Sequence, residues 1–145
     1  MLTLRDEQIE VFERRLFEAV QRNVQSAIAA TFPELCAGAT GGDPRDNGEA
    51  AARLGAIVER GIENAVRLDI GDGPDIAAFI ALGLALRLAP PGEAAWIHDY
   101  MNRLGTSGPT KLRMIESQLR ARGTVDNALS VIARRVAQAR DRVAP

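Results

Sequence analysis

Residues 54–86 constrain the fold of this chain more than any other stretch, because they predict two helices joined by a sharp turn. The second helix, residues 76–88, is apolar apart from Arg87. Asp72 stands where a side chain can cap this helix, and Pro74 falls in its first turn, where a missing N–H is harmless. We therefore expect residues 76–88 to form a central helix that is buried on all sides.

Apolar residues recur every three or four positions along most of the remaining chain, which is the spacing of one helix face. The first such stripe comprises Ile9, Phe12, Leu16, Val20, Val24 and Ile28. No stretch alternates in the manner of a β-strand, so the sequence predicts an all-α, single-domain bundle (1–145) of five or six helices. The expected spans are about 4–32, 49–68, 76–88, 93–103, 110–122 and 124–143.

Residues 34–48 have no helical period and are rich in Gly, Asp and Pro, which is typical of a loop. We therefore expect this segment to connect the first two helices without a helix of its own. A loop of this length inside a compact domain is either functional or mobile, and both readings stay open.

The apolar residues of 124–143 follow alternating steps of four and three, which is the heptad spacing of a helix–helix seam. These residues are Val125, Leu129, Ile132, Val136, Ala139 and Val143. Two interpretations stay open: the helix packs in its own bundle, or it forms a seam with a partner, including a second copy of the chain. Thr124 stands at the N-cap position of this helix.

Composition restricts the class of protein. Apolar residues make up 46% and charged residues 26% of the sequence, which are ordinary globular values. No apolar run reaches the length of a membrane-spanning helix, and the N-terminus becomes charged at once, unlike a signal peptide. We therefore expect a cytoplasmic protein.

Few residues could carry catalysis. His98 is the only imidazole and Cys36 the only thiol, so a nucleophile with a histidine base would have to recruit His98. A single cysteine forms neither an intrachain disulfide nor a cysteine-based zinc site. Glu59 and Glu63 share one helix face, but basic neighbours favour a solvated face over an acid–base pair. We predict no catalytic residues, no cofactor and no enzyme activity.

Three aspartates, Asp69, Asp72 and Asp75, surround two glycines in the turn and raise the question of a calcium site. Their spacing fails the EF-hand pattern, because Ile80 stands where a twelfth-position Glu is needed. A turn followed by a helix cap accounts for all three aspartates. We therefore predict no metal site.

Two regions contain candidate partner-binding residues. The short helix near residue 96 has Trp96, His98 and Tyr100, and the last helix has Arg134, Arg135 and Arg142. Net charge is about −6 over residues 1–110 and +5 over residues 111–145, so the basic end either meets an acidic partner or docks on the chain's own acidic surface. Nucleic acid is disfavoured, because no aromatic residue accompanies the basic charge.

Five short segments and their order along the chain can be compared with known protein families. An amphipathic helix runs into Phe32-Pro33-Glu34. Two further segments follow: Gly61-Ile-Glu-Asn-Ala-Val-Arg-Leu-Asp-Ile and Asp75-Ile-Ala-Ala-Phe-Ile-Ala-Leu-Gly. The last ones are Trp96 in Ala-Ala-Trp-Ile and Lys111-Leu, which precede a basic helix. Over about residues 4–120 the chain resembles small all-helical proteins encoded beside PAAR-type spike-tip and effector genes in bacterial type VI secretion clusters.

The resemblance implies a non-enzymatic accessory, an adaptor or chaperone-like protein that binds a secreted effector or a spike component. An alternative that also needs no catalysis is an immunity or regulatory protein that occludes a cognate toxin. Nucleic-acid binding through the basic end is the weaker third hypothesis, and no membrane partner is expected.

Overall fold

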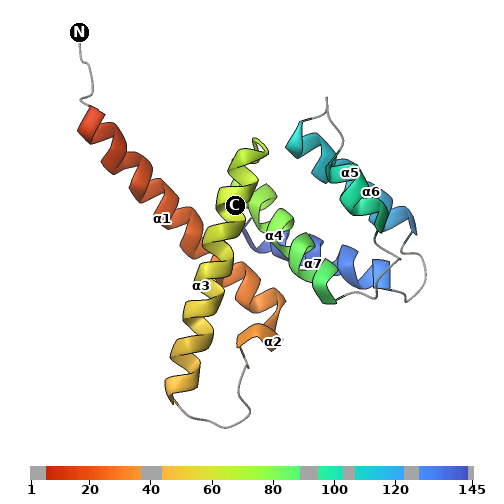
Figure 1. Ribbon diagram of the computed structural model, residues 1–145, viewed down its shortest axis with the longest axis horizontal. Helices are drawn as coiled ribbons and strands as arrows, with labels where there is room; N and C mark the ends of the chain where they lie inside the picture. Colours follow the sequence, from red (N-terminus) through yellow and green to blue (C-terminus); the bar gives the residue numbers. More distant parts are fainter. Residues whose placement is uncertain (1–5, 37–43, 89–94, 103–106, 123–127, 144–145) are drawn as a thin grey trace.

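The computed structural model describes residues 6–36, 44–88, 95–102, 107–122 and 128–143, and this part of the chain forms seven helices and no strand (Figure 1). The all-α prediction is therefore confirmed, with one short helix more than expected. The helices are α1 (Asp6–Thr31), α2 (Pro33–Cys36), α3 (Pro44–Arg67), α4 (Gly73–Leu88), α5 (Ala95–Met101), α6 (Gly108–Arg122) and α7 (Ala128–Val143).

The central helix of the bundle is α4, as the sequence predicts. It contacts α1, α3, α6 and α7, and its contact with α7 is the most extensive between any two helices of the described chain. Four small buried side chains of α4 allow this close approach: Ala77, Ala78, Ala81 and Ala85. The expectation of burial on all sides is wrong, because Gly83 is exposed and Phe79 is only partly buried on the face toward α3 and α5.

The apolar stripe of α7 lies in the core of its own chain. Leu129, Ile132, Val136 and Ala139 are all buried, and α7 packs on α1, α4 and α6. Bundle packing therefore accounts for the heptad spacing. A homodimer through 124–143 stays a prediction, and it would have to use other residues of this helix. Val125 and Thr124 lie outside the described residues.

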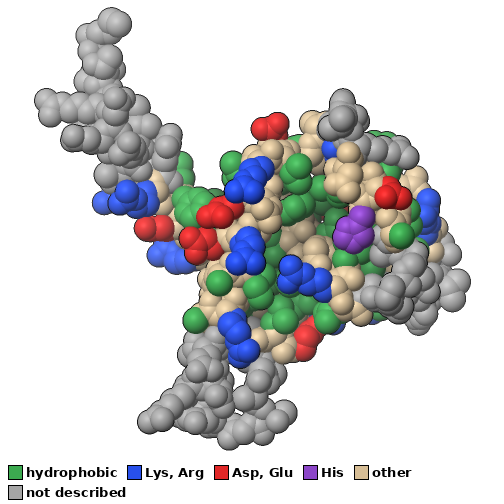
Figure 2. Space-filling view, in the orientation of Figure 1, with side chains coloured by type: hydrophobic (Ala, Val, Ile, Leu, Met, Phe, Trp, Pro, Cys, Tyr) green, Lys and Arg blue, Asp and Glu red, His purple; other side chains and the backbone are tan. Residues whose placement is uncertain are grey.

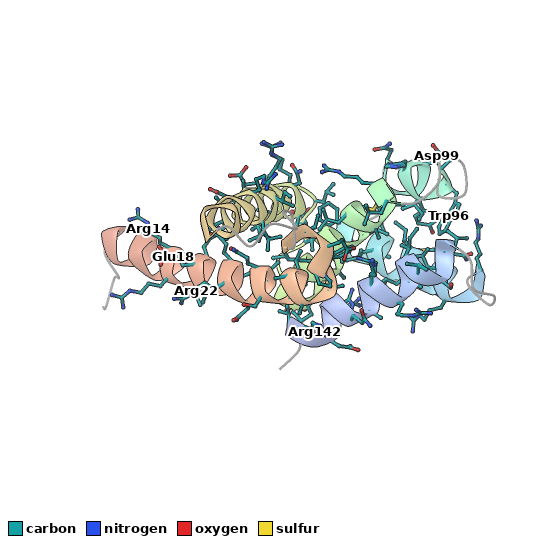
Figure 3. The ribbon with its side chains drawn as sticks, turned by 90° about the horizontal axis from the view of Figure 1, so that it is seen from below. Arg14, Glu18, Arg22, Trp96, Asp99 and Arg142 are labelled. Carbon is teal, nitrogen blue, oxygen red and sulfur yellow. The ribbon has the colours of Figure 1, made fainter. Side chains whose placement is uncertain are left out.

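Among the described side chains of α1, the buried ones lie in the C-terminal half of the helix. Val24, Ala27 and Ile28 lie in the core, whereas Leu16 is 52% exposed. The apolar stripe predicted from the sequence therefore does not enter the core at Leu16. The N-terminal half of α1 extends past the other helices in Figures 1 and 3, which agrees with the exposure of Leu16 and Phe17.

The predicted loop 34–48 is largely helical where the structure describes it. Pro33 starts the single turn of α2, and Pro44 starts α3, so residues 34–36 and 44–48 are helical and the prediction is wrong there. Both prolines occupy a first helical position, which needs no N–H donor and suits the proline φ angle. The remaining residues of the expected loop, 37–43, lie outside the described part of the chain.

The turn between α3 and α4 is a Schellman motif. Asp69 has φ 62°, the left-handed conformation in which a helix usually ends. The Ile70 N–H donates to the Ala65 carbonyl at 2.9 Å and the Asp69 N–H to the Val66 carbonyl at 3.0 Å. Ile70 is fully buried and provides the apolar contact of the motif. The interpretation of Asp69 as helix punctuation is thus correct.

Asp75 has a different role from the one predicted. Instead of serving the turn, its carboxylate is buried and forms an ion pair with Arg140 of α7. The same guanidinium donates to Glu116 of α6 at 2.9 and 2.7 Å. Burial alone would lower the pKa of Arg140, but the bonds to Glu116 and Asp75 outweigh it and raise that pKa. This three-residue cluster ties α4, α6 and α7 together.

Within the described residues, no helix has both the length and the apolar content needed to cross a membrane.

Candidate partner-binding groove

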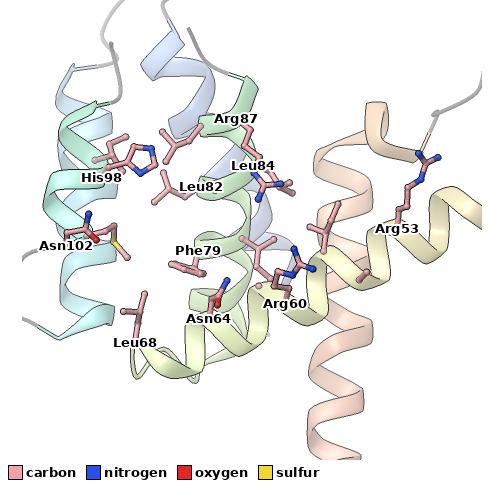
Figure 4. A pocket seen from close by; sticks show the side chains of 18 residues that line it. Arg53, Arg60, Asn64, Leu68, Phe79, Leu82, Leu84, Arg87, His98 and Asn102 are labelled. Carbon is pink, nitrogen blue, oxygen red and sulfur yellow. The ribbon is translucent and has the colours of Figure 1, made fainter. Parts of the chain in front are cut away.

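An open groove with a volume of about 600 Å³ lies between α3, α4 and α5 (Figure 4). Its floor is apolar, and Phe79 and Leu82 extend from α4 into the space that faces α5 (Figure 4). The other large apolar residues that line it are Ile57, Leu68, Ile80, Leu84, Leu86, Ile97 and Met101. The groove therefore runs along the face of α4 that contains the exposed Gly83 and the partly buried Phe79 and Leu86.

Two glycines shape this groove. A Cβ atom on Gly61 of α3 would lie 2.5 Å from Cγ1 of Ile80, so the absence of a side chain brings α3 close against α4 at this point. Gly83 lines the groove on α4, and a Cβ atom there would meet nothing within 4 Å. Gly61 thus closes one edge of the groove, and Gly83 widens its floor.

The opposite wall is α5, which is fixed to α6. Lys111 is buried, and its Nζ donates to the Met101 carbonyl at 3.1 Å, at the C-terminus of α5 where a cation is favourable. The Tyr100 hydroxyl donates to Sδ of Met114 at 3.1 Å. These contacts hold α5 on α6, and the groove remains between α5 and α3.

Arginines form the rim of the groove. Arg53 and Arg60 stand seven residues apart on α3 and share a face, and Arg87 lies near the end of α4. Within the described chain no ion pair is recorded for any of the three, and no described lining residue is acidic. Figure 2 shows basic side chains along one side of the hydrophobic hollow and the single histidine on the other. The groove thus combines an apolar floor with a positive edge.

The predicted residues of α5 divide between the groove and the α6 interface. His98 is exposed and lines the groove, whereas the described lining residues include neither Trp96 nor Tyr100. The Arg122 guanidinium lies 4.3 Å from the centroid of the Trp96 ring, a cation–π contact with α6. The Trp96 Nε1 is buried without a hydrogen-bond partner. Trp96 and Tyr100 therefore serve mainly to attach α5.

The predicted arginines of α7 do not join this groove. Arg134 and Arg142 are exposed, and Arg135 forms an ion pair with Glu34 of α2 and lies 4.6 Å from the centroid of the Phe32 ring. The basic helix thus docks in part on acidic residues of its own chain, as one of the two readings of the charge asymmetry predicted. The structure does not bring the α7 set and the α5 set into one site.

The arginines of the rim are not among the site residues predicted from the sequence. A signal was present, because Arg87 is the only charge in an apolar helix and Arg53 and Arg60 recur on one face of the preceding helix. Glu59 and Glu63, in contrast, are both exposed, in agreement with a solvated face. Among the described residues, no group of three His, Cys, Asp or Glu side chains could hold a metal ion.

Comparison with protein-family models, with curated proteins and with solved structures found no match to this chain.

The contact between α2 and α7 predicts a weak acid sensitivity. Burial raises the pKa of the Glu34 carboxyl, but its backbone hydrogen bond and the Arg135 guanidinium outweigh this effect and lower that pKa. A carboxyl whose pKa is depressed by folding contributes stability above its unfolded pKa of about 4.3, and this contribution disappears as the pH falls further.

Arg135→Gln should therefore reduce the loss of stability on acidification from pH 6 toward pH 3. Because the Glu34 side chain is 41% exposed, we expect its ion pair to contribute less than about 1 kcal/mol at pH 6 and nearly nothing at pH 3. Loss of the Arg135 contact with Phe32 adds a cost that is the same at both pH values. Urea denaturation at several pH values measures this difference. Arg142→Gln is the matched control, because Arg142 is exposed on the same helix. An equal loss at both pH values in Arg135→Gln would contradict the assignment.

Proposed function

We propose that this chain is a non-enzymatic protein-binding accessory that holds an apolar segment of its partner in the groove between α3, α4 and α5. The observation that carries the proposal is the groove of about 600 Å³ between α3, α4 and α5, which is lined mainly by apolar side chains. Concave, mostly apolar pockets of this kind are typical of binding sites. A groove between helices suits a helix of the partner, whose apolar side chains would fill the floor.

The class of partner rests on the resemblance alone. It favours a secreted effector or a spike-tip component of a type VI secretion system, which the chain would bind as an adaptor or a chaperone-like protein. An immunity protein that occludes a cognate toxin is the alternative, and it would need a binding surface of the same kind. Recovery of growth in cells that express a toxin from a flanking gene would favour immunity over the adaptor role.

Gly83 provides a variant that tests the groove without disturbing the core. Gly83→Leu places a side chain in the groove where a Cβ meets no neighbour, so partner binding should fall at least tenfold. Replacing an exposed helical glycine by leucine should leave the free energy of unfolding unchanged or raise it by up to about 1 kcal/mol. The measurement is affinity capture of proteins from flanking genes, co-expressed with the wild type or the variant.

Gly83→Ala is the matched control, because its methyl group fills little of the groove while it removes the same glycine. Capture of one flanking protein by the wild type and by Gly83→Ala, but not by Gly83→Leu, is the expected pattern. Equal capture by all three would place the binding surface elsewhere, and capture by none would refute the proposed partner class.

The nucleic-acid hypothesis has little support from the side chains of the basic end. Arg135 and Arg140 already form ion pairs with carboxylates of the same chain, which reduces the positive charge available to phosphates.

A further inference from the structure

The rim of the groove has charge of one sign. Arg53 and Arg60 of α3 and Arg87 of α4 line the groove and are exposed, and none of the described lining residues is acidic. Figure 4 shows Arg60 and Arg87 on the side of the groove opposite His98. Guanidinium groups stay charged at any physiological pH, so this side of the groove is permanently positive.

The described carboxylates of the chain do not neutralise this rim. Glu59, Glu63 and Asp99 lie on the helices that form the walls, but they are exposed and are not among the described residues that line the groove. No ion pair between a rim arginine and a described carboxylate is recorded. Arg140, in contrast, pairs with two carboxylates of its own chain. The rim arginines are therefore available to an acidic group from outside.

The positive rim borders an apolar floor. Phe79 and Leu82 extend from α4 into the groove, and Ile97 and Met101 line it from α5. Apolar side chains that enter the groove gain free energy because they leave water. An occupant that matches both features is apolar on the side that meets α4 and acidic along the edge that meets the arginines.

A helix can present this combination of side chains. Its apolar residues at i, i+3, i+4 and i+7 form one stripe, and the positions beside the stripe point toward the walls of a groove. An extended segment is less suitable, because its alternate side chains point to opposite faces. Its acidic residues would then point to solvent when its apolar residues fill the floor.

We propose that the segment held in the groove is an amphipathic helix of another protein with Asp or Glu along one edge of its apolar stripe. This inference rests on the proposed function and adds the chemistry of the partner to it. The carboxylates on that edge pair with Arg60 and Arg87, because a planar guanidinium can donate two parallel hydrogen bonds to one carboxylate. A helix with lysines at the same positions meets like charge at the rim and binds more weakly.

Two synthetic peptides of about 18 residues, long enough to form a helix, test the inference. Both have leucines along one helical stripe. The acidic peptide has glutamates beside the stripe, where the basic peptide has lysines. Fluorescence anisotropy with the full chain measures the affinity of each labelled peptide. The wild type should bind the acidic peptide at least about tenfold more tightly than the basic one, and high salt should reduce this preference.

Charge reversal on the rim provides the decisive measurement. Arg60→Glu with Arg87→Glu should reverse the preference, so that the basic peptide binds more tightly, and a reversed preference cannot result from misfolding. Both arginines are exposed, so the variant should stay folded, which circular dichroism checks. Arg113→Glu with Arg142→Glu makes the same change in net charge at two exposed positions that do not line the groove. This matched control should keep the preference for the acidic peptide.

Equal affinity of the wild type for the two peptides would overturn the inference. An unchanged preference in Arg60→Glu with Arg87→Glu would also overturn it, as would a wild type that binds neither peptide. Gly83→Leu separates such a failure from a failure of the proposed function. If the wild type binds both peptides equally and Gly83→Leu weakens both, the groove accepts an apolar helix of either charge and the proposed function stands. Peptide binding that Gly83→Leu leaves unchanged would lie outside the groove and would contradict both proposals.

Discussion

Gly108→Ala is expected to lower the free energy of unfolding by about 3 kcal/mol, the upper part of the range for a clash in a packed core. Gly108 is buried at the start of α6, and a Cβ atom there would lie 2.0 Å from the carbonyl oxygen of Leu68. The added Cβ atom would clash with main-chain atoms at the end of α3, next to the Schellman turn. A side-chain rotation therefore cannot relieve the clash. Either α6 or the turn must move.

Chemical denaturation measures this loss, and a melting temperature lower by roughly 10 °C should accompany it. Gly71→Ala is the matched control, because Gly71 is exposed and a Cβ atom there meets nothing within 4 Å. We expect that control to change stability by less than about 0.5 kcal/mol. Equal stability of the two variants would show that α6 does not lie against Leu68 in this way.

Arg140→Ala is expected to cost about 3 kcal/mol, because it leaves the carboxylates of Asp75 and Glu116 without their shared cation. Asp75 is nearly fully buried and Glu116 is mostly buried, so water compensates little for the lost guanidinium. Urea denaturation at neutral pH is the measurement. Arg142→Ala, two positions along α7 and exposed, should cost less than about 0.5 kcal/mol.

A double-mutant cycle separates the ion pair from general packing. The double variant Asp75→Ala with Arg140→Ala should lower the free energy of unfolding by less than the sum of the two single substitutions. The reason is that either substitution alone already breaks the ion pair, so the second one cannot break it again. Additive costs would contradict a direct interaction between Asp75 and Arg140. Arg140→Lys should recover only part of the loss, since an ammonium cannot bond two carboxylates with the fork geometry of a guanidinium.

Helical periodicity predicted the long helices of this chain but not the extent of their burial. Val24 and Leu16 belong to the same predicted stripe, yet the first is buried and the second is half-exposed. Spacing shows which face of a helix is apolar, because it depends only on residues of that helix. Whether another helix covers the face depends on where α3, α4 and α7 end.

The candidate site was predicted only in part. His98 was selected for its place on a short aromatic helix, and the structure places it at the groove. The arginines of α7 were selected for their charge, and Arg135 proved to be engaged by Glu34 of the same chain. Arg60 and Arg87 are not predicted as a site, because their positions show which helix face each lies on but not that the two residues line one groove.

By itself, the sequence determined the all-α class, the long helices and the sharp turn before residue 76, because these follow from residues within a few positions of one another. Only the tertiary structure decided that Asp75 pairs with Arg140, 65 residues away, and that one face of α4 stays open beside α3 and α5. Such outcomes depend on how whole helices cross, which is set by contacts such as that of Gly61 with Ile80.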